Sequence, residues 1–320
     1  MKNKDIKRKI KEEFQDIHMP SKKEKLLEDI QFVQPIQEDK HKNKHFNIKW
    51  QLSILTIACI CIFSFITLQT QDAYSISFEV NPSIELKVNN QRRVDDVICH
   101  NDDALLVLDD MDLKNTDLDV AVNAVIGSMF KHGYISEAKN SVLVSVQGSD
   151  QEKRNALKQD VATDVKDILS GYSLEASVVS QDYDFSKERE ALAKQYGISV
   201  GKVTLIQKLI NVSPNYDFED LIHLSINDLN TLIHYKHLNF KSITIDGVES
   251  HSGYLTNEQV KSKVLQHAHV NEESVYEYRD DLDVQDNQLI YIVEFTDEFA
   301  KYHYKVNAIS GEIVSFESEM

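Results

Sequence analysis

The sequence predicts an α+β fold attached to a single membrane-spanning helix, and three features lead to that prediction. An uncharged apolar stretch covers residues 50–70. Segments of strand and helix periodicity then alternate through residues 72–238. Residues 251–320 contain one amphipathic helix followed by three or four short strands. We therefore expect a single-pass membrane protein with a short helical cytoplasmic segment at residues 1–49, an α/β extracytoplasmic middle domain, and a small C-terminal domain in which one helix packs on an antiparallel sheet.

The apolar stretch has the length and composition of a transmembrane helix. No charge occurs between Lys49 and Asp72, and residues 52–68 include ten Leu, Ile or Phe residues. Each of these favours insertion by about 0.3–0.6 kcal/mol near the bilayer centre, and about twenty helical residues span the hydrocarbon core. The alternative is a buried helix of a soluble domain. A cleaved signal peptide is disfavoured, because about fifty residues would precede its apolar region and no A-x-A-like site follows it.

Charge is distributed unevenly along the chain. The net charge is −17, yet residues 1–50 carry 13 Lys and Arg against 9 Asp and Glu, whereas residues 71–320 carry 22 against 43. The acidic balance argues against general nucleic-acid binding. Basic residues before the apolar stretch place the N-terminus in the cytoplasm and the acidic part outside the cell membrane. Cys99 is the one cysteine outside the apolar stretch, so no disulfide is expected within the extracytoplasmic part.

Two short amphipathic helices are expected in the cytoplasmic segment. Pro20 separates them, and Ser21 with Glu24 forms a capping box that opens the second. Either their apolar stripes pack on each other in a marginal hairpin, or they bind a partner. The basic linker at residues 34–49 can also contact anionic lipid. The candidate partner-binding residues are Ile6, Ile10, Phe14, Leu26, Leu27 and Ile30.

The stretch FEVNPSIEL, residues 78–86, interrupts a strand pattern with an Asn-Pro pair. Apolar and polar residues alternate from residue 76 to residue 88, which is the period of a half-buried strand. Pro82 removes a ladder donor from the middle of this pattern and would confine the strand to a sheet edge or a β-bulge. From the residues alone, Asn81 and Pro82 are interpreted as a bulge that protects an edge strand.

Further elements follow from periodicity and turn residues. After the strand at 74–88, strands are expected at 93–100, 141–147 and 174–181, and helices at 116–133, 150–170, 186–196, 202–211 and 226–235. Residues 240–253 are expected to form a linker. In the C-terminal domain a helix at 256–268, opened by Thr256 with Gln259, precedes strands near 275–283, 288–295, 301–308 and 312–318.

These segments carry a resemblance to a known family. YSISFEVNPSIELKVNNQRRVDDV, AVNAVIGSMFKHGYI and SVLVSV resemble the extracytoplasmic middle domain of RsgI-type anti-sigma-I factors, and ISVGKVTLIQKLI with FEDLIHLSINDLNTLI is similar to its end. The tail, with YLTNEQVKSKVLQHAHV and IYIVEFTDEFAKYHYKVNAISGEIVSFE, is similar to a PepSY domain. The resemblance implies a membrane-tethered negative regulator that receives a signal outside the cell and binds a sigma factor inside it.

The resemblance also implies self-cleavage between Asn81 and Pro82. Ordinary asparagine deamidation needs the next backbone N–H, which proline lacks. The side-chain amide nitrogen of Asn81 can instead attack its own backbone carbonyl, close a succinimide and expel the proline nitrogen. A fold that orients or strains this peptide would lower the barrier. Glu79 and Glu85 share one strand face, but no feature of the sequence makes either a base. The resulting hypothesis is that, after cleavage, only strand pairing holds the two fragments together, so that pulling or unfolding the cut strand separates them.

The N-terminal segment departs from the family, whose members carry a compact, strand-containing anti-sigma domain there. The rival prediction is a membrane-anchored PepSY envelope protein that binds or inhibits a protease, or senses cell-wall material. An enzyme is disfavoured, because the chain has no H-E-x-x-H, G-x-S-x-G or Gly-rich phosphate loop. No cofactor or metal is expected: His41 and His45 lie in the charged linker, and the acidic residues at 280–286 lack the Gly and Glu of an EF-hand.

Overall fold

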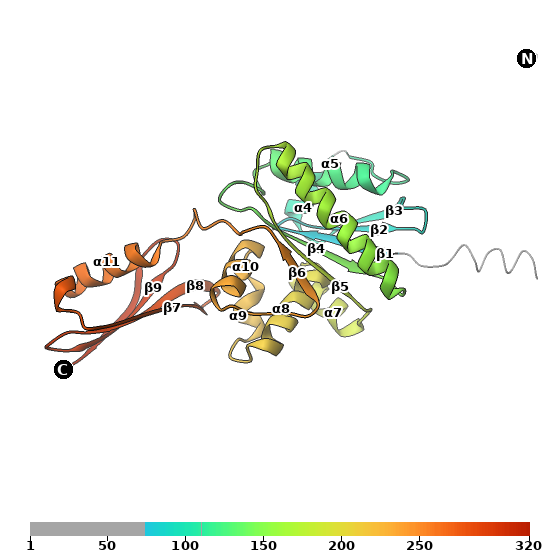
Figure 1. Ribbon diagram of the computed structural model, residues 1–320. Helices are drawn as coiled ribbons and strands as arrows, with labels where there is room; N and C mark the ends of the chain where they lie inside the picture. Colours follow the sequence, from blue (N-terminus) through green and yellow to red (C-terminus); the bar gives the residue numbers. More distant parts are fainter. Residues whose placement is uncertain (1–73, 110) are drawn as a thin grey trace, which may run out of the picture. The chain divides into compact units, whose positions relative to one another are not determined.

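A computed structural model describes residues 74–109 and 111–320. This part contains a six-stranded sheet between two groups of helices, followed by a four-stranded sheet that carries one long helix (Figure 1). The mixed α+β class is therefore confirmed. The first sheet has the order β3-β2-β1-β4-β5-β6. Its strands are β1 (Tyr74–Glu79), β2 (Ser83–Val88), β3 (Val94–Cys99), β4 (Ser141–Gln147), β5 (Ser177–Tyr183) and β6 (Ile243–Asp246).

The Asn-Pro pair lies in the loop of a β-hairpin. β1 and β2 pair antiparallel with Glu79 opposite Ser83, so Val80, Asn81 and Pro82 form a three-residue connection. The expected continuous strand with a bulge at a sheet edge is therefore wrong. β1 lies between β2 and β4, and β2 lies between β1 and β3. Pro82 fits because a loop residue needs no ladder hydrogen bond.

Both faces of this sheet are covered. The apolar side chains of the hairpin, from Ile76 to Val88, join one core with α4, α5 and α6, and α8 with α10 packs on the opposite face (Figure 1). The polar side chains of Ser77, Glu79 and Ser83 are consequently buried, although a half-buried strand was expected. The helices are α4 (Asp102–Leu108), α5 (Leu118–Lys131), α6 (Gln151–Gly171), α7 (Lys187–Tyr196), α8 (Val200–Val212), α9 (Phe218–Ile222) and α10 (Ile226–Tyr235).

The second half of the sheet is built on a βαβ unit. β4 and β5 run parallel and are connected through α6. β6 then pairs antiparallel with β5, so the expected linker at residues 240–253 in fact supplies an edge strand. After β6 the chain is held to the sheet by Asn140, whose Nδ2 donates to the carbonyl oxygen of Val248 at 2.9 Å and whose Oδ1 accepts from the backbone N–H of Ser250 at 2.6 Å. These contacts join segments about a hundred residues apart, which local sequence patterns do not reveal.

The C-terminal domain has the expected helix and antiparallel sheet. The helix is α11 (Asn257–Ala268), and a capping box between Thr256 and Gln259 opens it as predicted. Val260 and Val264 of α11 are fully buried together with Val293 and Tyr304 of the sheet. The strand order is β10-β9-β8-β7. The strands are β7 (Glu277–Gln285), β8 (Gln288–Thr296), β9 (Lys301–Asn307) and β10 (Ile313–Glu319), and a short 3₁₀ turn, η2 (Glu272–Ser274), precedes β7.

Candidate functional site

The hairpin loop holds Asn81 in an unusual backbone conformation. Its φ is 127°, a region that residues with a side chain rarely adopt, and Asn81 is exposed whereas Pro82 is buried. Such a conformation costs on the order of 1–3 kcal/mol and persists only where the surroundings enforce it. The backbone N–H of Val80 donates to the carbonyl oxygen of Pro82 at 3.1 Å, which closes the loop tightly around Asn81.

A buried carboxylate joins the two ends of this loop. Glu79, the last residue of β1, is only 1% exposed. Its Oε2 accepts a hydrogen bond from Ser83 Oγ at 2.6 Å and another from the backbone N–H of Ser199 at 3.1 Å. Ser199 is the N-cap of α8, where the helix dipole favours a negative charge. Glu79 thus fastens both ends of the loop to a helix 120 residues further along the chain.

Asn101 contacts the loop from the other side. It is the N-cap of α4, and its Oδ1 accepts from the backbone N–H of Ala104 at 3.0 Å and from that of Ser83 at 3.3 Å. Its Nδ2 donates to Asn81 Oδ1 at 3.5 Å. The sequence Asn101-Asp102-Asp103 is typical of a turn, but an Asn before two acidic residues is also a helix N-terminal signal, and here it opens α4. No sequence signal indicated its contact with Asn81.

Two other charged side chains bear on Glu79 and its face of the hairpin. Lys202, one turn into α8, is buried, and burial lowers its pKa although Glu79 and Asp228 oppose that effect. Glu85, which shares a face of the hairpin with Glu79, is engaged elsewhere. Burial acts to raise the pKa of Glu85, but hydrogen bonds from His100 and Ser75 outweigh it and lower the pKa. Of these two carboxylates, Glu79 is therefore the one that is hydrogen-bonded to the residue after the loop, Ser83.

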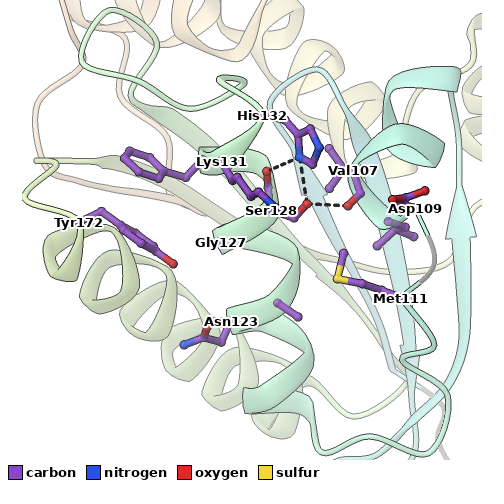
Figure 2. A pocket seen from close by; sticks show the side chains of 12 residues that line it. Val107, Asp109, Met111, Asn123, Gly127, Ser128, Lys131, His132 and Tyr172 are labelled. Atoms are coloured by element: carbon purple, nitrogen blue, oxygen red, sulfur yellow. Dashed lines mark hydrogen bonds between the residues drawn. The ribbon is translucent and has the colours of Figure 1, made fainter.

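A cavity of the described part lies at the far end of α4. It has a volume of about 770 Å³ and is lined by residues of α4, α5 and the end of α6. Figure 2 shows one hydrogen-bonded group in its lining: Ser128 donates to the carbonyl oxygen of Val107 at 2.6 Å and is hydrogen-bonded to His132 Nδ1 at 3.2 Å. Across residues 74–109 and 111–320, no cluster of His, Cys, Asp and Glu side chains has a geometry that could hold a metal ion.

The remaining predicted sites fall outside the described residues. These are the membrane-spanning segment at residues 50–70 and the six apolar residues of the cytoplasmic segment, from Ile6 to Ile30. Within the part of the chain that the structure describes, no helix has the length and apolar character needed to cross a membrane.

Comparison with known proteins identifies two domains of this chain. Residues 73–208 match the family described as the anti-sigma factor RsgI-like central domain, and residues 254–317 match the peptidase propeptide and YPEB domain, or PepSY. The chain is thus a protein with an RsgI-like central domain followed by a PepSY domain. The central domain thus matches the RsgI-like family and the C-terminal domain matches PepSY, which confirms the resemblance predicted from the sequence.

Relatives in two bacteria support this assignment over about half of the chain. Anti-sigma-I factor RsgI7 of Acetivibrio thermocellus is 26% identical over 155 residues, which are 48% of this chain and 28% of the relative. RsgI9 of the same organism is 28% identical over 158 residues, covering 48% and 22%. Anti-sigma-I factor RsgI of Bacillus subtilis is 26% identical over 157 residues, covering 48% and 40%. The matched region therefore spans less than half the length of each of these relatives.

Proposed function

We propose that this protein is a membrane-tethered regulator of the anti-sigma-factor type, and that self-cleavage between Asn81 and Pro82 allows its regulated release. The observation that carries the proposal is the position of this bond. It lies in a strained loop between two strands that are paired along their whole length. A cut there would separate the chain covalently while the sheet continues to hold the two pieces together.

The proposed reaction uses only the residue before the bond. Asn81 Nδ2 attacks the backbone carbonyl carbon of Asn81, forming the five-membered succinimide, and the carbon–nitrogen bond to Pro82 breaks. The proton lost by Nδ2 ends on the proline nitrogen, which becomes the new N-terminus. Water then opens the succinimide. Because nucleophile and carbonyl belong to one residue, the fold contributes by fixing their orientation, and the strained backbone is consistent with that role.

The cut strand would remain in the sheet. β1 belongs to the membrane-side fragment, residues 1–81, and is flanked by β2 and β4 of the other fragment, residues 82–320. Ile76 and Phe78 of β1 are fully buried, and Glu79 is hydrogen-bonded to Ser83 and Ser199 across the cut. Burying two such apolar side chains favours association by roughly 3–6 kcal/mol before the backbone hydrogen bonds are counted. Removal of β1 by force or unfolding would therefore be the controlled step.

Inside the cell, the segment proposed to act on the partner is the cytoplasmic segment at residues 1–49. Its six apolar candidates would bind a sigma factor, and its basic linker would lie against the bilayer, with residues 50–70 as the single membrane span. The N-terminus would then be cytoplasmic and the PepSY domain extracytoplasmic, where it could take an envelope protease or cell-wall ligand. Precipitation with residues 1–49 distinguishes this proposal from a PepSY envelope protein with an idle tail, which would recover no sigma factor.

Mass spectrometry of the denatured full chain tests the cleavage. The wild-type protein should yield fragments 1–81 and 82–320, and Asn81→Ala should yield one intact chain. Asn90→Ala is the matched control, because Asn90 lies in the exposed turn of the next hairpin and no proline follows it. It should cleave like the wild type. A single uncut mass for the wild-type protein would refute self-cleavage.

A further inference from the structure

We propose that Asn101 is a positioning residue that aims the amide of Asn81 for the cleavage reaction. The inference rests on the proposed self-cleavage and adds a second side chain to it, one that comes from the junction between β3 and α4. Asn101 Nδ2 donates a hydrogen bond to Asn81 Oδ1 at 3.5 Å. This is the side-chain contact that the structure shows for the amide of Asn81.

The orientation of the Asn101 amide is set by its other partners. Two backbone N–H groups, those of Ala104 and Ser83, point at the Asn101 oxygen at 3.0 and 3.3 Å. An oxygen can accept both bonds, whereas an NH₂ group in its place would face two donors. The Oδ1 atom must therefore face α4 and Ser83, and Nδ2 must face Asn81. The backbone N–H of His100 also donates to the carbonyl oxygen of Ser83 at 3.0 Å, which fixes the same segment against the loop.

The contact favours the reactive arrangement in two ways. Because Asn81 Oδ1 is held by Asn101, the Nδ2 atom on the same planar amide is the one left to approach the backbone carbonyl. When Nδ2 loses its proton during attack, negative charge spreads onto Oδ1, where the N–H of Asn101 stabilises it. The bond is long in the resting loop, as hydrogen bonds that act in a reaction often are before they tighten. The balance of the reaction is unchanged: Nδ2 bonds to the carbonyl carbon, the bond to Pro82 breaks, and the proton passes to the proline nitrogen.

The variant Asn101→Asp separates this role from the capping of α4. Aspartate keeps the oxygen that accepts from Ala104 and Ser83 and caps helices as well as asparagine does, but its ionised side chain cannot donate to Asn81. The full chain is synthesised in a cell-free system, quenched into denaturant at intervals, and the cut fraction is measured. We expect Asn101→Asp to slow cleavage about tenfold or more. When the same substitution is placed in an uncleaved Asn81→Ala background, the thermal midpoint of unfolding should not change. Asn271→Asp, at the N-cap of the short 3₁₀ turn η2, is the matched control and should cleave at the wild-type rate.

Two further measurements separate the loss of the hydrogen-bond donor from effects of charge and of helix capping. Asn101→Ser keeps a neutral capping oxygen but is too short to place a donor on Asn81, so it should also slow cleavage, which excludes a purely electrostatic effect of the aspartate. The rate of Asn101→Asp relative to wild type should rise toward one as the pH approaches about 4, because a protonated carboxyl regains a donor. A helix-capping role alone would not produce this recovery.

The outcomes distinguish a failure of self-cleavage from a failure of the role assigned to Asn101. An uncut wild-type chain refutes self-cleavage and the role of Asn101 with it. A wild-type chain that cleaves while Asn101→Asp and Asn101→Ser cleave at the same rate leaves self-cleavage in place and overturns the role of Asn101. Slow cleavage of both variants that tracks a lowered thermal midpoint, with no recovery at acidic pH, also overturns it, because the residue would then act only through the stability of α4.

Discussion

Replacing Phe78 by alanine tests whether β1 holds the two fragments together. Phe78 is fully buried in β1, opposite Ile84 of β2 and Val144 of β4. Truncating a buried phenylalanine to alanine costs about 3–5 kcal/mol, from the lost transfer energy and the cavity that remains. In an uncleaved Asn81→Ala background, the free energy of unfolding should fall by this amount. In the cleaved protein the same loss should weaken the association of the fragments roughly a hundredfold to a few thousandfold.

The assay follows the release of the ectodomain. The cleaved full chain is immobilised in detergent through a tag at its N-terminus, and the fraction of fragment 82–320 that elutes is measured over time. Val120→Ala, on the exposed face of α5, is the control and should leave release unchanged, since Val120 is 58% exposed. If Phe78→Ala were fully cleaved and released its ectodomain as slowly as the control, the retention of β1 by packing would be refuted.

Two other predictions concern how the hairpin is held in the domain. Gly201 lets α8 approach the sheet closely: a Cβ at this position would lie 2.4 Å from Ser145 Oγ and 2.7 Å from Ser77 Oγ. Gly201→Ala should therefore lower stability by about 1–3 kcal/mol in urea unfolding, and Gly253→Ala, where nothing lies closer than 3.9 Å, should change it little. Because the pKa of Glu85 is lowered in the folded protein, its ionised side chain stabilises the fold fully at pH values above the ordinary pKa of 4.5. This stabilisation is lost as the pH falls below 4.5 toward the lowered pKa. Glu85→Gln should flatten this acidic loss of stability, and an unchanged pH dependence would contradict the assignment.

Periodicity alone does not distinguish the observed hairpin from the continuous strand that was expected. The pairing of Glu79 with Ser83 joins residues of equal parity, so even-numbered residues face the same core before and after the three-residue loop. A continuous strand and this hairpin therefore produce the same alternation from residue 76 to residue 88. Only Pro82 distinguished them, and it was interpreted as a bulge.

The polar face of the hairpin was misjudged for a different reason. Its residues were expected to meet solvent, because serines and glutamates usually do. In the fold they meet α8, which supplies a helix N-terminus for Glu79 and a glycine where the helix approaches the sheet. The strands β4 and β5 and the helices α5, α6, α7 and α10 were predicted close to their observed bounds, because hydrophobic periodicity and capping residues act locally. The short strand β6 was missed, because its four residues form a strand only by pairing with β5.

The sequence by itself determined what chemistry is available and where apolar surface must be buried. An asparagine before proline can react only through its own side chain, because proline has no N–H, and this holds in any fold. The tertiary structure decided whether that chemistry has a site. Glu79, Asn101 and Ser199 converge on the loop at Asn81 from three separate elements, one of them 120 residues away in the chain. Such contacts arise from the pairing of β1 with its neighbours and the packing of α4 and α8 around them, which no local pattern of residues encodes.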